Sequence, residues 1–325
     1  MSRGKDAEFP DSCSYMIYFS VGRLTMKKNV ILTLTLILLA GGGYYLTRGV
    51  PWQKEALFFS KLAKETVNII VIKTAEENEV RLEKRNNSWV VADQGSVPAN
   101  QDRVDDILRV TTELIREELI SENPDKQSDL QVNSSGTRVQ LYQGDNVVAD
   151  YYVGQVGPDF YSTYVRKEGE DKVYLVNKVL ASVVMPLDWR NLTIMEFDFN
   201  EVVKLTVQNG DIQFALEKQD TEWKVVNSTE SVDADKVMDI IYDLAYLKAE
   251  DIDISISTTD AGLDNPARQY QVELNSGVSQ SLFIGNQVDD KIYVKSNGTE
   301  TIYQIDSSVL EGFPQSLTDL QSLLP

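Results

Sequence analysis

Apolar and polar positions alternate along several short segments of this chain, with the two-residue period of a β-strand. These segments are Val67–Lys73, Val80–Lys84 and Ser88–Val91, followed later by Val202–Gln208, Gln213–Lys218 and Glu222–Val226. Polar pairs suited to hairpin turns, Asn86-Asn87 and Gln219-Asp220, separate the last two segments of each group. The pattern therefore predicts two matching groups of three antiparallel strands.

After each group the period changes to that of an amphipathic helix, with apolar residues three or four positions apart. The apolar positions are Val104, Ile107, Leu108, Thr111, Leu114 and Ile115 in the first segment, and Val237, Ile240, Ile241, Leu244 and Leu247 in the second. Asn100 and Asp233 precede the two segments and are suitable N-caps. We predict one main helix in each half of the chain.

Each predicted helix is followed by strands and a short closing helix. The strands are Arg138–Tyr142, Tyr151–Gly154, Tyr161–Arg166 and Val173–Val176, matched by Tyr270–Leu274, Ser281–Ile284, Ile292–Lys295 and Ile302–Ile305. The closing helices are expected near Val179–Met185 and Ser308–Leu317. The links between these strands are too short for crossover helices, so an α+β fold with antiparallel sheets is predicted rather than a parallel doubly wound sheet.

The two halves also repeat individual residues. Leu82-Glu83-Lys84 and Trp89 return 134 positions later as Leu216-Glu217-Lys218 and Trp223, and Gly154 returns as Gly285. A repeat of this length indicates a duplicated domain, because solenoid units are about 20–50 residues long. We predict one repeat domain over residues 67–196, a second over 197–317, and a tail over 318–325. The shared residues are mainly core and turn types, so they describe architecture rather than chemistry.

Residues 30–46 form an apolar segment without charge, which as a helix would reach about 25 Å, enough to cross a bilayer core. A basic pair precedes this segment, so we predict a signal anchor over residues 26–48 with the later domains outside the cytoplasm. Cleavage near Gly42, which would release a secreted protein, is the alternative. Residues 1–25 are interpreted as a spurious or disordered extension. Residues 49–66 are interpreted as a juxtamembrane amphipathic helix, whose pattern begins at residue 51 and which lies along the outer membrane surface or packs on the first domain.

Charge and composition exclude several function classes. The chain carries a net charge of −19. Six basic and three acidic residues lie in 1–48, so the rest of the chain carries −22 and repels nucleic-acid phosphates. The absence of histidine excludes a Ser-His-Asp triad and the usual zinc sites, and the only cysteine is Cys13. We predict no catalytic residues, no metal and no cofactor, and no nucleic-acid partner.

Three sets of residues invite a functional interpretation beside a structural one. The paired Trp89 and Trp223 could stack on a ligand, but core packing beneath the helices is the favoured interpretation. Glu83-Lys84 and Glu217-Lys218 point to opposite faces of their strands, which argues against joint catalysis. Three acidic residues could bind a cation, but they lie in the first turns of a predicted helix, where acids are expected anyway. They are Asp102, Asp105 and Asp106.

The motifs of the second half resemble the family called domain of unknown function 4340. They are Leu216-Glu217-Lys218, Trp223, Asp235, Gly262-Leu263-Asp264-Asn265-Pro266, Leu282-Phe283-Ile284-Gly285 and Tyr293-Val294. The first half departs from them at Asp129-Leu130-Gln131-Val132, which stands in place of the Gly-Leu-Asp-x-Pro turn. The resemblance implies a bacterial, membrane-anchored protein often encoded beside ABC-type transporters, and it transfers no catalytic residue.

Two functions are therefore expected from different classes. The first is a non-catalytic accessory protein, held in the bacterial cytoplasmic membrane by residues 30–46, with a transporter permease or another membrane subunit as its partner. The second is a module that binds cell-envelope polysaccharide or peptide. A glycosidase would need two inward-facing carboxylates about 5–10 Å apart in one cleft, and the sequence nominates no such pair.

Overall fold

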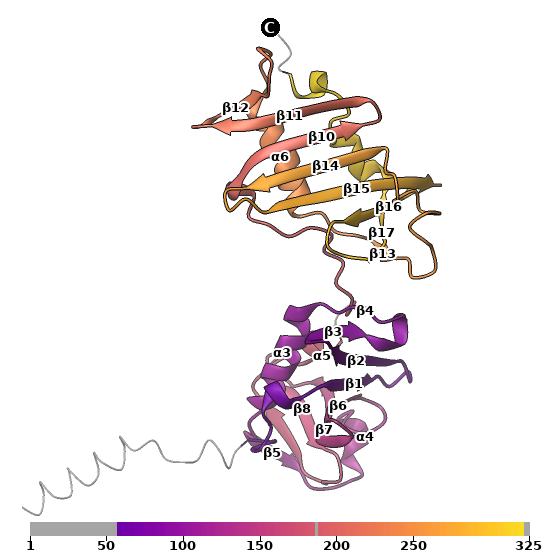
Figure 1. Ribbon diagram of the computed structural model, residues 1–325. Helices are drawn as coiled ribbons and strands as arrows, with labels where there is room; N and C mark the ends of the chain where they lie inside the picture. Colours follow the sequence, from indigo (N-terminus) through magenta and orange to yellow (C-terminus); the bar gives the residue numbers. More distant parts are fainter. Residues whose placement is uncertain (1–56, 186–187, 322–325) are drawn as a thin grey trace, which may run out of the picture.

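The structure, a computed structural model, describes residues 57–185 and 188–321. These residues form two lobes joined by a narrow connection (Figure 1). We call residues 57–185 the first lobe, residues 193–321 the second lobe, and residues 188–192 the junction segment. Each lobe is built on one antiparallel sheet with few helices, which confirms the predicted combination of antiparallel sheets and helices.

The sheet of the first lobe has nine strands among the described residues, each antiparallel to its neighbour. In spatial order they are β4 (Val97–Pro98), β3 (Ser88–Val91), β2 (Glu79–Arg85), β1 (Ile69–Lys73), β6 (Thr137–Gln143), β7 (Asn146–Val156), β8 (Thr163–Lys167), β9 (Val173–Val176) and β5 (Glu118–Ser121). Asn86 and Asn87 both have positive φ, which makes the β2–β3 turn at the predicted pair.

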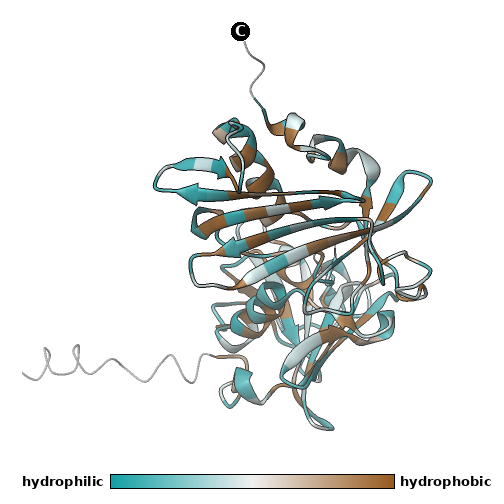
Figure 2. Ribbon diagram, turned by 45° about the horizontal axis from the view of Figure 1, so that its top comes forward, coloured by the Kyte–Doolittle hydropathy of each residue, from teal (hydrophilic) through white to brown (hydrophobic). Residues whose placement is uncertain are grey.

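The sheet of the second lobe repeats this order with eight described strands. They are β12 (Glu222–Val225), β11 (Ile212–Gln219), β10 (Val202–Asn209), β14 (Arg268–Leu274), β15 (Ser279–Val288), β16 (Lys291–Ser296), β17 (Tyr303–Asp306) and β13 (Asp251–Ile252). Figure 2 shows hydrophobic and hydrophilic residues alternating along these strands. One irregularity also matches, because the register shifts between Val153 and Val156 in β7 and between Ile284 and Gln287 in β15.

One helix covers a face of each sheet, α3 (Gln101–Thr112) in the first lobe and α6 (Ala234–Ala245) in the second (Figure 1). Both predicted N-caps are confirmed: Asn100 accepts from the Arg103 amide and Asp233 from the Asp235 amide, each at 3.1 Å. The buried residues of the helices pack on the strands in the main core. This burial holds each helix in place, since short helices are marginal alone.

The remaining helices are short. They are α4 (Lys126–Asp129), α5 (Ala181–Val184), η1 (Lys64–Thr66), η2 (Ala92–Gln94), η3 (Phe199–Glu201), η4 (Ser307–Gly312) and η5 (Leu317–Leu320). The two closing helices are thus briefer than the sequence predicts. Tyr161, predicted within a strand, lies in the loop before β8, and the β11–β12 turn falls at Asp220-Thr221 because β11 extends through Gln219.

The amphipathic helix expected over residues 51–66 is not continuous in its described part. Residues 57–61 form an isolated bridge and turns, and only Lys64–Thr66 is helical. Phe58 and Phe59 are buried against the first lobe, so core packing rather than a membrane surface holds their side chains. The predicted anchor over 26–48 lies outside the described residues. Among the described residues, no helix combines the length and the apolar character needed to span a membrane.

The chain enters both lobes in the same way. At the start of the first lobe, Leu57 forms a bridge with Ile115 and the Phe58 amide donates to the Leu114 carbonyl at 2.9 Å. At the start of the second lobe, Thr193 forms a bridge with Lys248. The Ile194 amide then donates to the Leu247 carbonyl at 3.1 Å. The residues that precede β1 and β10 therefore belong to the first and the second lobe, respectively.

The junction segment pairs with both lobes at once. On the first lobe, the Asn191 amide donates to the Pro98 carbonyl at 2.7 Å, and on the second the Ala249 amide donates to the Leu192 carbonyl at 2.7 Å. The guanidinium of Arg190 joins Asp188 at 2.8 Å and Asp251 at 2.5 Å. Backbone pairing and ion pairs thus connect the lobes through a few residues.

Candidate functional site

The repeated Leu-Glu-Lys and Trp residues occupy matching places in the two lobes. Leu82 and Leu216 are fully buried in β2 and β11. Trp89 and Trp223 are 4% and 7% exposed, and each faces the lysine of its motif across a hairpin. The tryptophans are therefore embedded in the two cores rather than presented to a ligand.

The two motif glutamates form ion pairs on the sheets. Glu83 lies between Arg81 and Arg85, both at 2.7 Å, and their hydrogen bonds lower its pKa. Glu217 pairs with Lys204 at 2.7 Å, and this contact raises the pKa of Lys204. The two glutamates belong to different sheets and do not converge on one cavity.

Gly154 and Gly285 allow a loop of the same lobe to lie against the sheet. We call this loop, residues 127–132 in the first lobe and 258–263 in the second, the covering loop. A Cβ on Gly154 would lie 2.2 Å from the Leu130 carbonyl oxygen, and one on Gly285 would lie 2.1 Å from that of Ala261. The next amide in each strand donates to the same carbonyl, Gln155 to Leu130 at 3.2 Å and Asn286 to Ala261 at 2.7 Å. Only glycine leaves room for this contact in either lobe.

The Gly-Leu-Asp-x-Pro motif ends a helical turn with a Schellman cap. Gly262, at φ +71°, donates to Thr259, and Leu263 donates to Thr258. Asp264 accepts from the Thr259 hydroxyl, and this bond is the largest cause of its lowered pKa. Pro266 follows in the loop before β14.

The first lobe builds the same cap with different residues. Gln131, at φ +56°, donates to Ser128, and Val132 donates to Gln127. Gln131 and Val132 thus correspond to Gly262 and Leu263 by geometry. At this motif, the two lobes therefore differ less in structure than in sequence.

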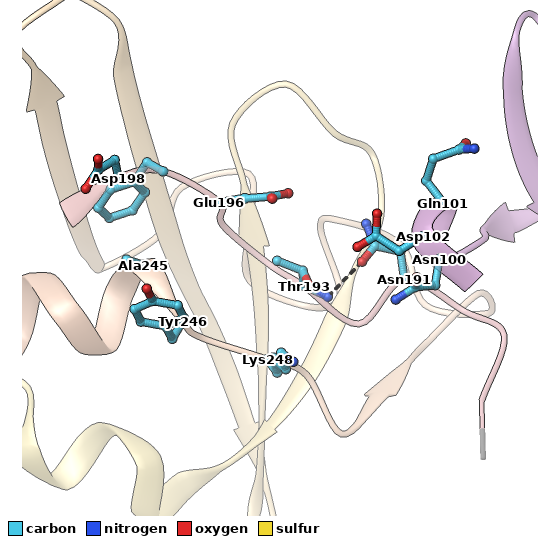
Figure 3. Close-up of a pocket in the computed structure, with 11 residues that line it drawn as sticks. Asn100, Gln101, Asp102, Asn191, Thr193, Glu196, Asp198, Ala245, Tyr246 and Lys248 are labelled. Carbon is cyan, nitrogen blue, oxygen red and sulfur yellow. Dashed lines mark hydrogen bonds between the residues drawn. The ribbon is translucent and has the colours of Figure 1, made fainter. Parts of the chain in front are cut away.

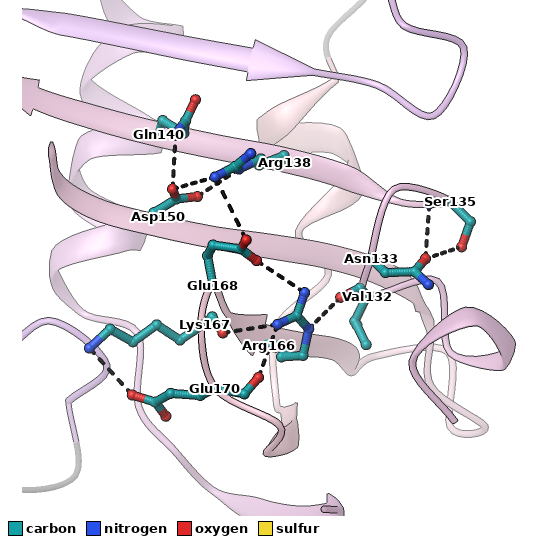
Figure 4. A network of polar contacts seen from close by, with 10 residues as sticks. All are labelled: Val132, Asn133, Ser135, Arg138, Gln140, Asp150, Arg166, Lys167, Glu168 and Glu170. Carbon is teal, nitrogen blue, oxygen red and sulfur yellow. Dashed lines mark hydrogen bonds and ion pairs between the residues drawn. The ribbon is translucent and has the colours of Figure 1, made fainter. Parts of the chain in front are cut away.

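A polar network on the first sheet fixes the covering loop (Figure 4). Arg138 pairs with Asp150 at 2.7 Å, and this hydrogen bond raises the Arg138 pKa. Arg166, which is 6% exposed, donates to the Val132 carbonyl at 2.7 Å and pairs with Glu168 at 3.2 Å. Because these side chains satisfy one another or the backbone, the network is a structural connection.

A cleft of about 500 Å³ lies between the lobes beside the junction segment. Its lining comes from the start of α3, the junction segment and the residues after it, and the end of α6 with the residues that follow it. The lining residues are Asn100, Gln101, Asp102, Asn191, Thr193, Glu196, Phe197, Asp198, Ala245, Tyr246 and Lys248. Figure 3 shows Asn100, Gln101 and Asp102 on one side of the cleft, and Asp198 and Tyr246 on the other. A ligand in the cleft would touch both lobes.

The cleft combines aromatic rings with an excess of acidic groups. Tyr246 is 56% exposed and packs against Tyr242, with ring centroids 4.6 Å apart, and both contact Phe199. Three carboxylates line the cleft and one lysine, Lys248, opposes them. Such a lining suits a neutral polar or basic ligand better than an anion.

The three acidic residues near the start of α3 do not converge. Asp102 lines the cleft, Asp105 accepts from Gln101 at 3.0 Å, and Asp106 pairs with Arg109 at 2.7 Å. Among the described residues, no group of three or more His, Cys, Asp or Glu side chains is placed to hold a metal ion.

The sequence pointed to two of the cleft residues, Asn100 as a helix cap and Asp102 as one of three acidic residues, but it did not predict the cleft. Glu196, Tyr246 and Lys248 lie outside the repeated motifs, so the comparison of the halves gave them no weight. The signal that could have identified these residues is a difference between matched positions of the two lobes. By the matching backbone bonds of Leu114 and Leu247, Tyr246 and Lys248 correspond to Glu113 and Ile115.

Comparison with known proteins agrees with the motifs. Neither the curated proteins nor the solved structures include a match to the chain. The family model described as domain of unknown function (DUF4340) matches residues 89–266, more than half of the chain, in one stretch that crosses the junction segment. The chain therefore belongs to the DUF4340 family.

Proposed function

We propose that this protein is a non-catalytic accessory subunit, anchored in the bacterial cytoplasmic membrane, that binds a component of an ABC-type transport system outside the cytoplasm. The apolar segment over residues 30–46 supports the anchoring. The transporter partner rests on the family resemblance. In this proposal the first lobe lies near the membrane and the second lobe lies farther out, since the two lobes follow the anchor in order.

The observation that carries the proposal is the cleft between the lobes. Both lobes and the segment between them contribute polar groups to one open space of about 500 Å³, and Tyr246 stands exposed in it. Exposed tyrosines are favourable at protein interfaces, since the ring adds contact area and the hydroxyl a hydrogen bond. The acidic lining favours a neutral or basic surface on the partner.

Anchoring strengthens such a contact without any new bond. A partner in the same membrane meets the cleft at the effective concentration set by the tether, which for short flexible linkers is on the order of millimolar. Even a weak contact would then be populated. This argument favours a membrane protein over a soluble one as the partner.

The test places a photo-crosslinking amino acid at position 246 of the full chain in native membranes. Val278, which is 53% exposed in the β14–β15 turn, is the matched control position. We expect a crosslink to a transporter permease from position 246 and none from 278. A membrane-bound chain that gives no crosslink, or the same products at both positions, would refute the proposal.

A second candidate function, binding of envelope polysaccharide or peptide, is favoured by one specific feature. Tyr246 and Phe197 in the cleft lie beside amide and carboxylate side chains, and aromatic rings with polar neighbours suit sugars. Retention of the full chain on isolated cell-wall material tests it. Loss of retention in Tyr246→Ala, with Val278→Ala unchanged, would favour this function over the first.

A further inference from the structure

Two consecutive aromatic residues stand out at the tip of the β7–β8 connection. Phe160 is 80% exposed and Tyr161 is 73% exposed, the largest values among the exposed large hydrophobic residues of the described chain. Val156 pairs with Thr163 across the base of this tip and is 39% exposed. Val179 is 40% exposed and lies beside the same base, because the Thr163 hydroxyl donates to the Lys178 carbonyl and accepts from the Leu180 amide. The tip therefore presents an apolar surface to the surroundings.

Several hydrogen bonds fix the conformation of the turn that carries these rings. The Asp159 carboxylate accepts from the amides of Tyr161 at 3.1 Å and Ser162 at 3.0 Å, and from the Ser162 hydroxyl at 2.5 Å. The Gly157 amide donates to the Ser162 carbonyl at 2.8 Å and closes the loop. A turn held in this way presents its side chains in a fixed direction.

Phe160 is also held in an unfavourable backbone conformation. Its φ is +63°, in the left-handed region that bulky residues avoid, and its amide donates to the Gly157 carbonyl at 3.1 Å. The ring gains little burial in return, because four fifths of it is exposed. Backbone strain of this kind is concentrated at functional positions, where the surrounding structure maintains it.

The tip lies at the end of the first lobe where the chain enters. Thr163, just after the tip, pairs with Val176, and the adjacent Leu175 pairs with Glu118 in the edge strand β5. Glu118 comes three residues after Ile115, which forms the bridge with Leu57, the first described residue. Figure 1 shows the described chain beginning beside β5.

The apolar segment 30–46 is close to this end in sequence. Ten residues, 47–56, separate it from Leu57, a length that spans at most about 36 Å when fully extended. If residues 30–46 cross the bilayer, the end of the first lobe that carries Phe160 and Tyr161 stays within reach of the membrane surface.

We propose that Phe160 and Tyr161 insert into the interfacial layer of the membrane and orient the first lobe on it. This inference rests on the membrane anchoring in the proposed function. Aromatic side chains favour the interfacial layer, where the ring meets the acyl chains and the hydroxyl of tyrosine meets water and headgroups. The net charge of −22 outside residues 1–48 favours zwitterionic over anionic lipid as the surface.

The small size of the patch favours a lipid surface over a protein. Two rings of this exposure offer on the order of 300 Å², whereas a stable protein interface buries about 800 Å² on each partner. A bilayer needs no matching shape, and the anchor already supplies the main attachment. A second, weaker contact is then sufficient to fix the orientation of the lobe.

The experiment measures the depth of a nitroxide label on the full chain reconstituted in phosphatidylcholine vesicles. The label is attached to Tyr161→Cys in a Cys13→Ser background, since Cys13 is the only native cysteine. The control label is at Ile212→Cys, which is 48% exposed in the second lobe. Collision with oxygen relative to a water-soluble nickel complex gives the depth at each site.

We expect the label at position 161 to be shielded from the nickel complex several-fold more than the label at 212. A label at Val179→Cys should show partial shielding that is lost when Phe160 and Tyr161 are both replaced by serine. Equal water exposure at 161 and 212 in a vesicle-bound chain would overturn this inference and leave the anchoring intact. A chain that does not remain on the vesicles would overturn the anchoring and this inference together.

Discussion

The replacement Gly285→Ala should destabilise the second lobe, because the backbone of the covering loop occupies the space of the new methyl group. The added Cβ would lie 2.1 Å from the Ala261 carbonyl oxygen and 3.0 Å from Cγ of Leu263. Unstrained heavy-atom contacts lie near 3.5 Å, so the loop or the strand must move by more than 1 Å.

The expected cost follows from what this movement breaks. The Asn286 amide would lose its 2.7 Å hydrogen bond to Ala261, worth about 1 kcal/mol. Overpacking against Leu263 adds about 1–3 kcal/mol. We therefore expect the free energy of unfolding to fall by about 2–4 kcal/mol, which is about 1–2 M in the urea midpoint at a slope of about 2 kcal/mol/M.

Urea unfolding of the purified chain, followed by far-ultraviolet circular dichroism, measures this change. Gly312→Ala is the matched control, because no atom lies within 4 Å of the Cβ it would add. The control should stay within about 0.5 kcal/mol of the unsubstituted chain. Gly154→Ala should behave like Gly285→Ala in the first lobe, and a Gly285→Ala chain as stable as the control would refute the reasoning.

Three further predictions concern buried, charged and junction residues. Thr111→Val removes the 2.8 Å partner of the buried Tyr151 hydroxyl and should cost about 1–3 kcal/mol in urea unfolding, while a second change, Tyr151→Phe, should recover part of it. Burial and the neighbouring Asp239 raise the pKa of Asp243, so the folded state disfavours its charged form. Asp243→Asn should therefore stabilise the chain at about pH 7 by about 0.2–0.5 kcal/mol, and this gain should disappear below about pH 4, where Asp243 is protonated in both states. Arg190→Met should speed hydrogen exchange of the junction amides, measured by mass spectrometry, because both ion pairs of Arg190 are lost.

Local sequence signals predicted the regular elements well. The caps at Asn100 and Asp233 are side-chain oxygens followed by helical periodicity, and both lie where the sequence places them. The strand Val173–Val176 has the predicted bounds. These elements follow from the spacing of hydrophobic residues along the chain and from hydrogen bonds between residues that are close in sequence.

Elements fixed by distant contacts could not be predicted in the same way. The edge strand β5, Glu118–Ser121, is four residues long and mostly exposed, and it exists because β9 pairs with it. The helical pattern of residues 51–66 does not produce a continuous helix in its described part, because Phe58 and Phe59 pack in the core of the first lobe. Gln131 was not recognised as the counterpart of Gly262, since glutamine rarely takes a positive φ.

Residues that the two lobes share are structural, whereas the cleft lies at positions where the lobes differ. The residues that the halves share, such as Leu82 and Leu216, lie in the cores, so the shared residues are those that each fold requires. The cleft lies where the halves differ: Tyr246 and Lys248 take the places of Glu113 and Ile115 at the end of the main helix.

The position of Ile115 also explains why the first lobe has a different surface there. Ile115 forms a bridge with Leu57 at the start of the first lobe, as Lys248 does with Thr193 at the start of the second lobe. The same backbone geometry thus serves two purposes. In the first lobe it lies at the end that faces the membrane in our proposal, and in the second it opens onto the junction segment. If binding resides in this asymmetry, exchanging Tyr246 and Lys248 for Glu and Ile should abolish the crosslink from a photo-crosslinking amino acid placed at a second cleft position, Gln101. The stability of both lobes should stay within about 1 kcal/mol, since the side chains of Tyr246 and Lys248 are at the surface.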